Sequence, residues 1–301
     1  MRIPIEGLRV GHHTDADART GCTVLLFPEG TVASGEVRGG APATREFDLL
    51  APERAIERLD ALVLSGGSAF GLAAADGVVS CLADAGIGYA TDGGPVPIVV
   101  GLALYDLLEG DGSVRPTAGD GRAAAETATA TAEKAVATGS VGAGTGATVG
   151  KWRGRARARP GGVGVAVVAH GGVTVAAVVA VNAAGDVGDS ATSAAVADGV
   201  FGGWPVAGGG EGASDLSGLW GNTTIGAVVT DAALTKAECL LMAQSAHDGL
   251  ARAVFPPHMR SDGDAFVAAA TGRVEAAEAA DIDVLRVLAV AAVERAVVRA
   301  C

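Results

Sequence analysis

Apolar positions along the chain fall into short runs and longer alanine-rich stretches. The short runs predict strands at residues 22–27, 61–64, 163–169, 173–181 and 223–230. The third and fourth runs are joined by His170-Gly-Gly172, and a glycine-rich turn between two β-branched runs is typical of a β-hairpin. The run at 61–64 leads through Ser65-Gly-Gly67 into an alanine-rich stretch, which indicates a strand, a tight turn and a helix.

The alanine-rich stretches predict helices at residues 68–85, 123–137, 232–254 and 281–300. The last two are apolar on more than one face, so we expect both to be deeply buried. Residues 1–60 are otherwise glycine-rich and read as irregular. Strands and helices are therefore mixed, with an antiparallel signal, and this favours a layered α/β architecture. Because no shift in composition marks a boundary, residues 1–301 are predicted to form a single domain.

The composition limits the core and the partners. Aromatic residues make up only 4% of the 301 residues, so the core must be built from Ala, Val and Leu. The formal net charge of −12 argues against binding nucleic acid or an anionic membrane surface, and we expect neither partner. The one basic cluster, residues 151–159, is short and is interpreted as a solvated strand edge or turn.

Three features predict a cytoplasmic protein. The four cysteines are scattered and include no CxxC pair, which favours reduced thiols. The first residues, Met-Arg-Ile-Pro-Ile-Glu, lack the apolar core of a signal peptide. The most apolar stretch, 163–181, is interrupted by His170-Gly-Gly172, whereas a membrane helix needs about 20 apolar residues.

Several familiar motifs match only in part. Gly142-Ala-Gly-Thr-Gly-Ala147 fits a loose dinucleotide fingerprint, but the fingerprint requires a strand before it, and here a predicted helix precedes. Gly150-Lys151 lacks the upstream glycine and the following Ser or Thr of a phosphate-binding loop. The five histidines form no metal-binding pattern. We therefore expect neither a metal nor a cofactor.

Ser68 lies at a strand-to-helix turn, where a nucleophile elbow would place it. The GxSxG elbow needs a second glycine, and position 70 is Phe. A Ser-His-Asp hydrolase that uses Ser68 is the weaker alternative. Such a turn also caps a helix, or binds a carboxylate or oxyanion through free N–H groups.

The junction Trp220-Gly-Asn-Thr-Thr-Ile225 carries a chemical signal. A small, polar, glycine-rich stretch at 208–221 reads as a linker and runs directly into the predicted strand at 223–230. If the Asn222–Thr223 bond breaks, Thr223 gains an α-amine with an unperturbed pKa of about 7.7–8.0. That amine can act as general base on its own hydroxyl. From the residues alone, a turn that ends in a strand is the simpler interpretation.

Nine short segments carry a family resemblance. They are Val10-Gly-His12, Arg38-Gly-Gly-Ala-Pro42, Leu64-Ser-Gly-Gly-Ser-Ala-Phe-Gly-Leu72, Val96-Pro-Ile-Val99, Gly139-Ser-Val-Gly-Ala-Gly-Thr-Gly146, Val181-Asn-Ala-Ala-Gly-Asp-Val187, Asn222-Thr-Thr-Ile225, Ala246-His-Asp-Gly-Leu-Ala-Arg-Ala253 and Asp262-Gly-Asp264. In this order the chain resembles the DmpA-type aminopeptidases (L-aminopeptidase/D-amino-acid esterase, peptidase family S58), which include β-aminopeptidases and nylon-oligomer endohydrolases. The resemblance implies a four-layer αββα sandwich like that of N-terminal nucleophile hydrolases. It also implies self-cleavage into residues 1–222 and 223–301, and a homo-oligomer, often a tetramer of such pairs.

The resemblance assigns roles to residues around the junction. Thr223 matches the nucleophile, and the Asn222-Thr223 pair is the choice of the nylon-oligomer branch, whereas the DmpA branch usually has Ser. Thr223 is preferred to Thr224 because it alone follows the matching Asn. Asn182 matches an asparagine that helps to stabilise the oxyanion. Lys151 matches a lysine of the nylon-oligomer branch that would hold negative charge or tune the amine.

The resemblance also assigns roles to an acidic pair and to residues of the substrate pocket. Asp262 and Asp264 match the acidic residues that orient the new ammonium or hydroxyl of the nucleophile. Alternate residues of an extended segment face the same way, so both carboxylates can point inward. Tyr105 matches a substrate-pocket tyrosine at loose spacing, and Ser68 is assigned to substrate binding.

The resemblance implies a threonine-nucleophile amidase or aminopeptidase close to the nylon-oligomer endohydrolases. Short peptides, amino-acid amides and 6-aminohexanoate oligomers are the expected substrates. An acyltransferase of the ornithine-acetyltransferase type is the alternative, since only the nucleophile that resolves the ester differs. A non-catalytic protein of the same fold is the third hypothesis, and the intact Asn222-Thr223, Asn182 and Asp262-Gly-Asp264 argue against it.

Overall fold

The computed structural model describes residues 1–131, 135–152, 154–188, 221–274 and 281–301. Two five-stranded sheets form its centre. The first contains, in spatial order, β1 (Arg9–Asp15), β2 (Thr20–Leu26), β5 (Ala61–Ser65), β6 (Val99–Ala103) and β4 (Ala43–Arg45). The second contains β3 (Val32–Val37), β14 (Ala265–Val274), β12 (Thr223–Ala232), β10 (Val173–Asn182) and β9 (Gly162–His170). Short pairs join β7 (Thr148–Val149) to β8 (Arg159–Pro160), and β11 (Asp186–Val187) to β13 (Val254–Phe255).

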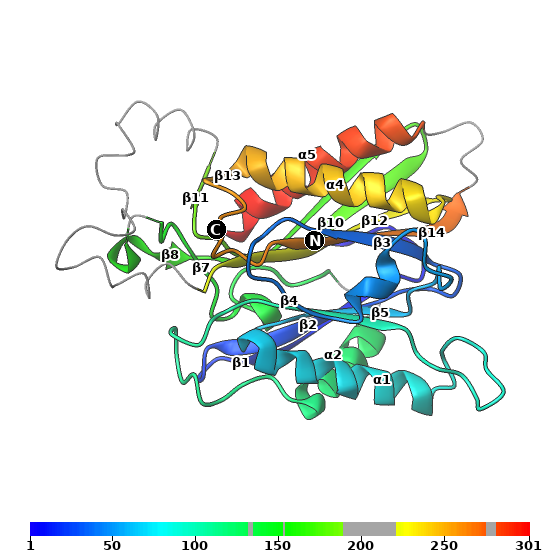
Figure 1. Ribbon diagram of the computed structural model, residues 1–301, viewed down its shortest axis with the longest axis horizontal. Helices are drawn as coiled ribbons and strands as arrows, with labels where there is room; N and C mark the ends of the chain where they lie inside the picture. The colour runs from blue at the N-terminus through cyan, green and yellow to red at the C-terminus, as the bar shows by residue number, and fades with distance from the viewer. Residues whose placement is uncertain (132–134, 153, 189–220, 275–280) are drawn as a thin grey trace.

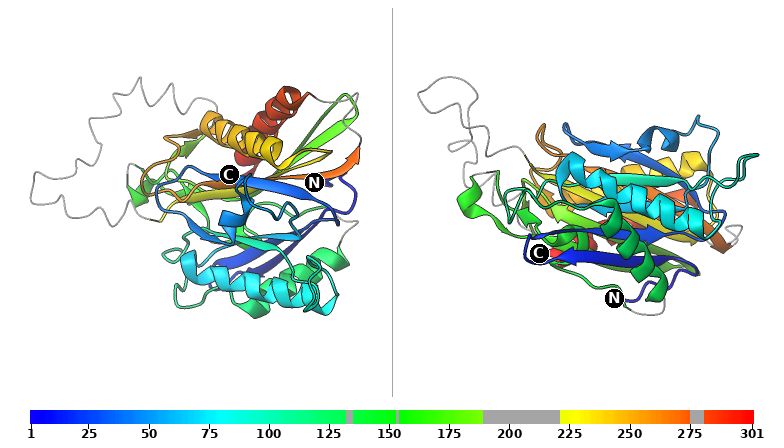
Figure 2. Two further views of the ribbon diagram at one scale, coloured as in Figure 1. Left: turned by 45° about the vertical axis from the view of Figure 1, so that its right-hand side comes forward. Right: turned by 90° about the horizontal axis from the view of Figure 1, so that it is seen from below.

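Helices cover the outer face of each sheet (Figure 1). In Figure 1, α1 (Ala74–Asp84) and α2 (Ala118–Ala130) lie below the first sheet, and α4 (Lys236–Ala253) and α5 (Ile282–Ala300) lie above the second. The view turned by 45° also shows the two sheets between the two helix pairs (Figure 2, left). The chain is therefore a four-layer αββα sandwich, which confirms the predicted fold class.

The alternation of side chains along each strand explains the layers. Successive strand residues point to opposite faces, so each sheet has two apolar faces to bury. Leu62 and Leu64 of β5 pack with Val178 of β10 in the core between the sheets. The intervening Val63 faces the cluster that contains α1 and α2 residues, and Val179 faces the cluster that contains α4 and α5 residues.

The helices differ from the predictions mainly at their ends. A 3-10 segment, η2 (Ser68–Ala73), precedes α1 within the helix predicted at 68–85. Helix α2 begins before the predicted 123 because Thr117 and Asp120 form a capping box. Residues 132–134 of that prediction lie outside the described residues. The predicted deep burial of α5 is wrong, since Val287 is 67% exposed.

The strands follow the apolar runs where those runs are β-branched. The predicted hairpin is confirmed as β9 and β10, which pair antiparallel, and the predicted strand at 223–230 is confirmed as β12. The prediction of an irregular stretch over residues 1–60 is wrong, because β1, β3 and β4 lie there. Strands β6 and β14 were also not predicted. Except for Gly221, the predicted linker at 208–221 lies outside the described residues.

None of the helices in the described ranges combines the length and the apolar content that crossing a membrane would require.

Candidate active site

Thr223 is the first residue of β12, and β12 lies in the middle of the second sheet. Its neighbours are β14, which runs parallel to it, and β10, which runs antiparallel. The register places Asn182 opposite Thr223 on one side and Asp262 beside Asn222 on the other. The sheet therefore brings together three of the segments that the sequence singled out.

The carbonyl of Asn222 accepts two hydrogen bonds at this point. One comes from the hydroxyl of Thr223, and the other comes from the backbone N–H of Gly263 at 3.0 Å. A Cβ at Gly263 would lie 2.8 Å from the Thr223 hydroxyl and 2.8 Å from the carbonyl oxygen of Ala41. Glycine is therefore required between the two aspartates, because the Thr223 hydroxyl and the backbone of Ala41 occupy the space of a side chain.

Thr224 faces a different environment from Thr223. Its hydroxyl is buried and has no hydrogen-bond partner among the described residues, while its backbone N–H donates to Oδ1 of Asp264 at 2.7 Å. Successive strand residues point to opposite faces, so only Thr223 turns its hydroxyl toward the Asn222 carbonyl. This arrangement favours Thr223 over Thr224 as the nucleophile.

The side chain of Asn182 is fully buried and connects four groups. Its Nδ2 donates to the carbonyl of Tyr105 at 2.8 Å and to the carbonyl of Gly221 at 3.3 Å. Its Oδ1 accepts from the backbone N–H of Thr148 at 2.9 Å and from Nζ of Lys151 at 2.8 Å. These bonds fix the amide in one orientation, with one donor directed at Tyr105 and the other at the chain just upstream of Thr223.

Lys151 is buried rather than solvated, which corrects the interpretation of the basic cluster at this residue. Only 2% of it is exposed, and its ammonium donates to Oδ1 and to the main-chain oxygen of Asn182. Burial lowers the pKa of the Lys151 ammonium to about 7, although the charge of Glu109 opposes the shift. Near neutral pH this side chain can therefore donate or accept a proton.

Asp262 and Asp264 are both buried, as their alternation predicted, and they differ in their partners. Oδ2 of Asp262 accepts from the backbone N–H of Met259 at 2.7 Å, whereas Oδ1 has no partner among the described residues. Burial and then the neighbouring Asp264 raise the pKa of the Asp262 carboxyl to about 8. Asp262 is accordingly an acid at neutral pH with an oxygen available for a new partner.

Asp264 is held by a histidine that the sequence analysis did not single out. Its Oδ2 contacts Nδ1 of His258 at 2.8 Å and accepts from the His258 backbone N–H at 3.2 Å. The His258 ring meets His247 edge-on at 5.0 Å between centroids, and burial lowers the pKa of His247 to about 4. No pattern in the sequence signals this pair, because His258 reaches Asp264 through a left-handed turn with φ of 53°.

The structure places Tyr105 beside this cluster, and Ser68 contacts Leu104, the residue before Tyr105. Tyr105 presents its carbonyl to Asn182, and its ring lies where a side chain at Gly221 would be. Ser68 donates its backbone N–H to Leu104, and no hydrogen bond among the described residues joins its hydroxyl to Thr223 or to a histidine.

Three N–H groups at the turn before and at Ser68 have hydrogen-bond partners. The N–H of Gly66 donates to Gly21, and the N–H of Gly67 donates to Oδ1 of the buried Asp106 at 2.7 Å. The N–H of Ser68 is occupied by Leu104. These three N–H groups are therefore already paired within the fold, and the assignment of this turn to substrate binding stays a prediction.

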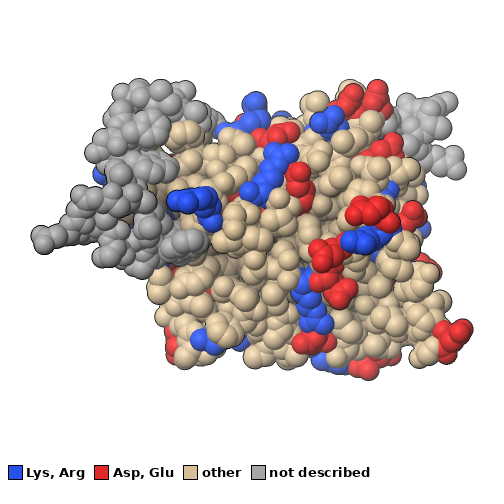
Figure 3. Space-filling view, in the orientation of Figure 1, with Lys and Arg blue, Asp and Glu red and all other residues tan. Residues whose placement is uncertain are grey.

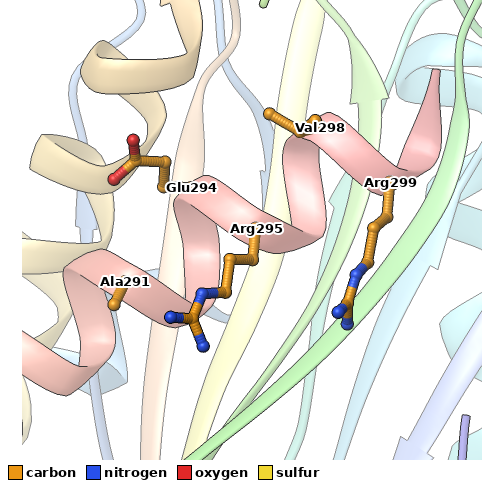
Figure 4. A pocket seen from close by; sticks show the side chains of 5 residues that line it. All are labelled: Ala291, Glu294, Arg295, Val298 and Arg299. Carbon is orange, nitrogen blue, oxygen red and sulfur yellow. The ribbon is translucent and has the colours of Figure 1, made fainter. Parts of the chain in front are cut away.

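The outer surface carries charged side chains and a concavity outside this cluster. On the face shown in Figure 3, basic and acidic side chains lie interspersed among uncharged ones. A concavity along α5 is lined by Ala291, Glu294, Arg295, Val298 and Arg299 (Figure 4). Glu294 is engaged by Arg252 at 2.7 Å, and none of the lining residues belongs to the Thr223 cluster.

Comparison with known proteins finds a matching family. The sequence model of peptidase family S58 matches residues 3–301. An uncharacterized aminopeptidase of Mycobacterium leprae (strain TN) is 44% identical over 297 residues, which cover 93% of this chain and 81% of the relative. A 6-aminohexanoate-oligomer endohydrolase of Kocuria sp. (strain KY2) is 29% identical over 285 residues, covering 91% of this chain and 76% of the relative.

Two solved structures share the fold. The β-aminopeptidase of Burkholderia sp. has a TM-score of 0.70 at 26% identity and covers 98% of this chain and 84% of its own. The L-aminopeptidase D-Ala-esterase/amidase of Ochrobactrum anthropi, described as a variant among the Ntn hydrolase fold, has a TM-score of 0.72 at 23% identity, with the same coverage.

Proposed function

Because this chain belongs to peptidase family S58 and is an amide-bond hydrolase, we propose that it cuts itself between Asn222 and Thr223 and then works through the freed Thr223. One observation carries this proposal. The Thr223 hydroxyl is hydrogen-bonded to the carbonyl of Asn222 at the start of a central strand, so the nucleophile lies beside the bond that it would cut.

The self-cleavage follows from the chemistry of that pair. Oγ of Thr223 adds to the carbonyl carbon of Asn222 and loses its proton, and the C–N bond to Thr223 breaks as the nitrogen takes up a proton. The product is an ester between Asn222 and the Thr223 hydroxyl, together with a free α-amine. Water then splits the ester and returns the hydroxyl. The chain becomes two pieces, residues 1–222 and 223–301.

The new α-amine would lie in an acidic environment. Asp262 lies beside Asn222 in the parallel register, and its Oδ1 makes no hydrogen bond among the described residues. Asp264 accepts a hydrogen bond from the backbone N–H of Thr224. These carboxyls would orient the amine so that its neutral form takes the proton of the Thr223 hydroxyl. Turnover would then proceed by acylation of Thr223, release of the amine product and attack by water.

Asn182 and Lys151 are proposed to act on the substrate carbonyl. The Asn182 amide points one donor toward the chain upstream of Thr223, where an acyl group on Thr223 would be bound. Lys151 anchors Oδ1 of the same amide and supplies positive charge. A side-chain amide donor of this kind is worth about 2.7–4 kcal/mol of transition-state stabilisation.

The substrate class follows from the relatives rather than from the pocket. The chain is similar to aminopeptidases and to a 6-aminohexanoate-oligomer endohydrolase. We therefore propose short peptides, amino-acid amides or 6-aminohexanoate oligomers as substrates, with Tyr105 as part of the pocket wall. A homo-oligomer of cleaved pairs and a cytoplasmic location stay predictions.

A substrate panel tests the activity. Purified protein is incubated with dipeptides, β-amino-acid amides and 6-aminohexanoate oligomers, and the products are measured by mass spectrometry. We expect hydrolysis of at least one class and a transient acyl adduct on the fragment that begins with Thr223. Acetyl transfer from N-acetylornithine to glutamate without any amide hydrolysis would instead favour the acyltransferase.

A further inference from the structure

We propose that the backbone N–H of Gly263 is the oxyanion donor of the self-cleavage step, and that the Asn182 amide is not. The inference rests on the proposed function, because it concerns how the Asn222–Thr223 bond is cut. It separates two reactions at one nucleophile: the single cut of the chain and the later turnover of substrate.

The two donors point at different carbonyls. Gly263 donates its N–H to the carbonyl oxygen of Asn222 at 3.0 Å, which is the oxygen that becomes negative when Thr223 adds. Asn182 donates to Gly221 at 3.3 Å and to Tyr105 at 2.8 Å. The amide therefore serves the carbonyl one residue upstream of the scissile bond, and both of its N–H directions are occupied.

The sheet itself positions the Gly263 N–H. Ile225 pairs with Ala265 in the parallel ladder between β12 and β14, and Asn222 pairs with Asp262 in the same register. Because the register continues past the ends of the named strands, the N–H after Asp262 meets the carbonyl of Asn222. A donor held by a strand ladder is preorganised and needs no reorganisation as the charge develops.

The close approach of the two segments also depends on Gly263. A Cβ there would lie 2.8 Å from the Thr223 hydroxyl and 3.3 Å from the Thr223 methyl group. The same glycine thus gives the nucleophile its space and the carbonyl its donor. The neighbouring Asp262 does not repel the new negative charge near neutral pH, because burial keeps the pKa of that carboxyl at about 8.

The charge and bond changes balance around this donor. When Oγ of Thr223 adds to the carbonyl carbon, the π electrons of the Asn222 carbonyl move onto its oxygen, where the Gly263 N–H meets them. The carbonyl re-forms when the C–N bond breaks, and the Thr223 nitrogen leaves as the amine. The N–H of Gly263 transfers no proton; it only stabilises charge.

An amide-to-ester substitution tests the assignment. Gly263→glycolic acid, introduced by nonsense suppression in cell-free translation, replaces the N–H by an oxygen and leaves the side chain unchanged. Gly39→glycolic acid is the matched control. It makes the same chemical change in the same neighbourhood, removing a 3.2 Å bond to the carbonyl of Asp264 instead of the bond to Asn222. The uncut and cut chains are followed over time on a denaturing gel, and thermal unfolding checks that each chain is folded.

We expect the ester at 263 to slow self-cleavage by about 100- to 1000-fold, which is the usual effect of losing one oxyanion donor. The ester at 39 should cut within about threefold of wild type. A loss of less than tenfold at 263, or an equal loss at 39, would overturn the assignment while leaving self-cleavage intact. If the wild-type chain itself stays uncut, the proposed function fails instead.

Discussion

The side-chain amide of Asn182 donates to the carbonyl of Gly221, one residue before the bond that we propose is cut. In the uncut chain this contact holds the segment upstream of Thr223 against Asn182, the last residue of β10. Once residues 1–222 have a free end, Gly221 can leave, and the Asn182 donor becomes available to a substrate carbonyl. Cleavage would thus free the Asn182 donor for substrate and also generate the α-amine of Thr223.

Gly221→Ala should slow self-cleavage by roughly tenfold. The backbone at Gly221 has φ of +102°, where a side chain costs about 1–2 kcal/mol, and the new methyl group would overlap the Tyr105 ring. Gly188→Ala is the control, because Gly188 also has a positive φ and a Cβ there meets no atom of the described residues within 4 Å. The cut fraction over time on a denaturing gel measures the effect, and equal rates for both variants would contradict the account.

Lys151→Met should stabilise the fold near neutral pH while abolishing activity. Burial lowers the pKa of Lys151 from 10.5 to about 7 in the folded chain. Between these values the unfolded chain binds the extra proton, so wild-type stability rises with pH across this window. The variant removes that dependence, and Oδ1 of Asn182 keeps its bond from Thr148. Its gain in urea midpoint should be largest at pH 7 and shrink toward pH 10; a gain that grows with pH would refute the burial argument.

Asp262→Asn should change stability with the opposite pH dependence. The pKa of Asp262 rises from 3.8 to about 8 on folding, so the folded chain holds the extra proton between these values and wild-type stability falls as pH rises. The gain in stability of the variant over wild type should therefore be largest at pH 8 and absent near pH 4. Urea midpoints at several pH values measure this, with the exposed Asp92→Asn as control. A gain in urea midpoint that is the same at every pH would contradict the raised pKa of Asp262.

His258→Gly should slow both self-cleavage and turnover by at least about tenfold, because a hydrogen bond to a charged group contributes about 1.5–3 kcal/mol. Glycine accepts the left-handed backbone at this position without strain, so the variant removes the ring that holds Asp264 together with its edge-on contact with His247. Added imidazole should restore part of the rate. His170→Gly, at the exposed end of β9, is the control, and failure of imidazole to rescue a folded variant would assign His258 a purely structural role.

The sequence was most informative where local pattern and local structure coincide. The β9–β10 hairpin and β12 are predicted correctly from their continuous runs rich in β-branched residues. Strand β14 is not predicted, because Ala-Phe-Val-Ala-Ala-Ala has no clear period of two and alanine favours helices. Strand β3, Val-Ala-Ser-Gly-Glu-Val, is too polar to be read as a buried strand, although it pairs along β14.

The candidate site was predictable only through resemblance to a family. Asn182, Thr223 and Asp262 are far apart in sequence and meet because of strand register, which no local pattern reveals. The burial of Lys151 was not predicted, because the arginines that follow it make the segment look like a solvated basic cluster. The contact between His258 and Asp264 depends on the left-handed backbone of His258. A single histidine in the sequence gives no indication of that conformation.

Intact-mass spectrometry of freshly purified protein, with N-terminal sequencing, tests the central claim most directly. The account predicts two chains, residues 1–222 and 223–301, the second beginning with Thr223, and one uncut and inactive chain for Thr223→Ala. A wild-type protein that hydrolyses amides as a single uncut chain would contradict it, as would cleavage that persists in Thr223→Ala.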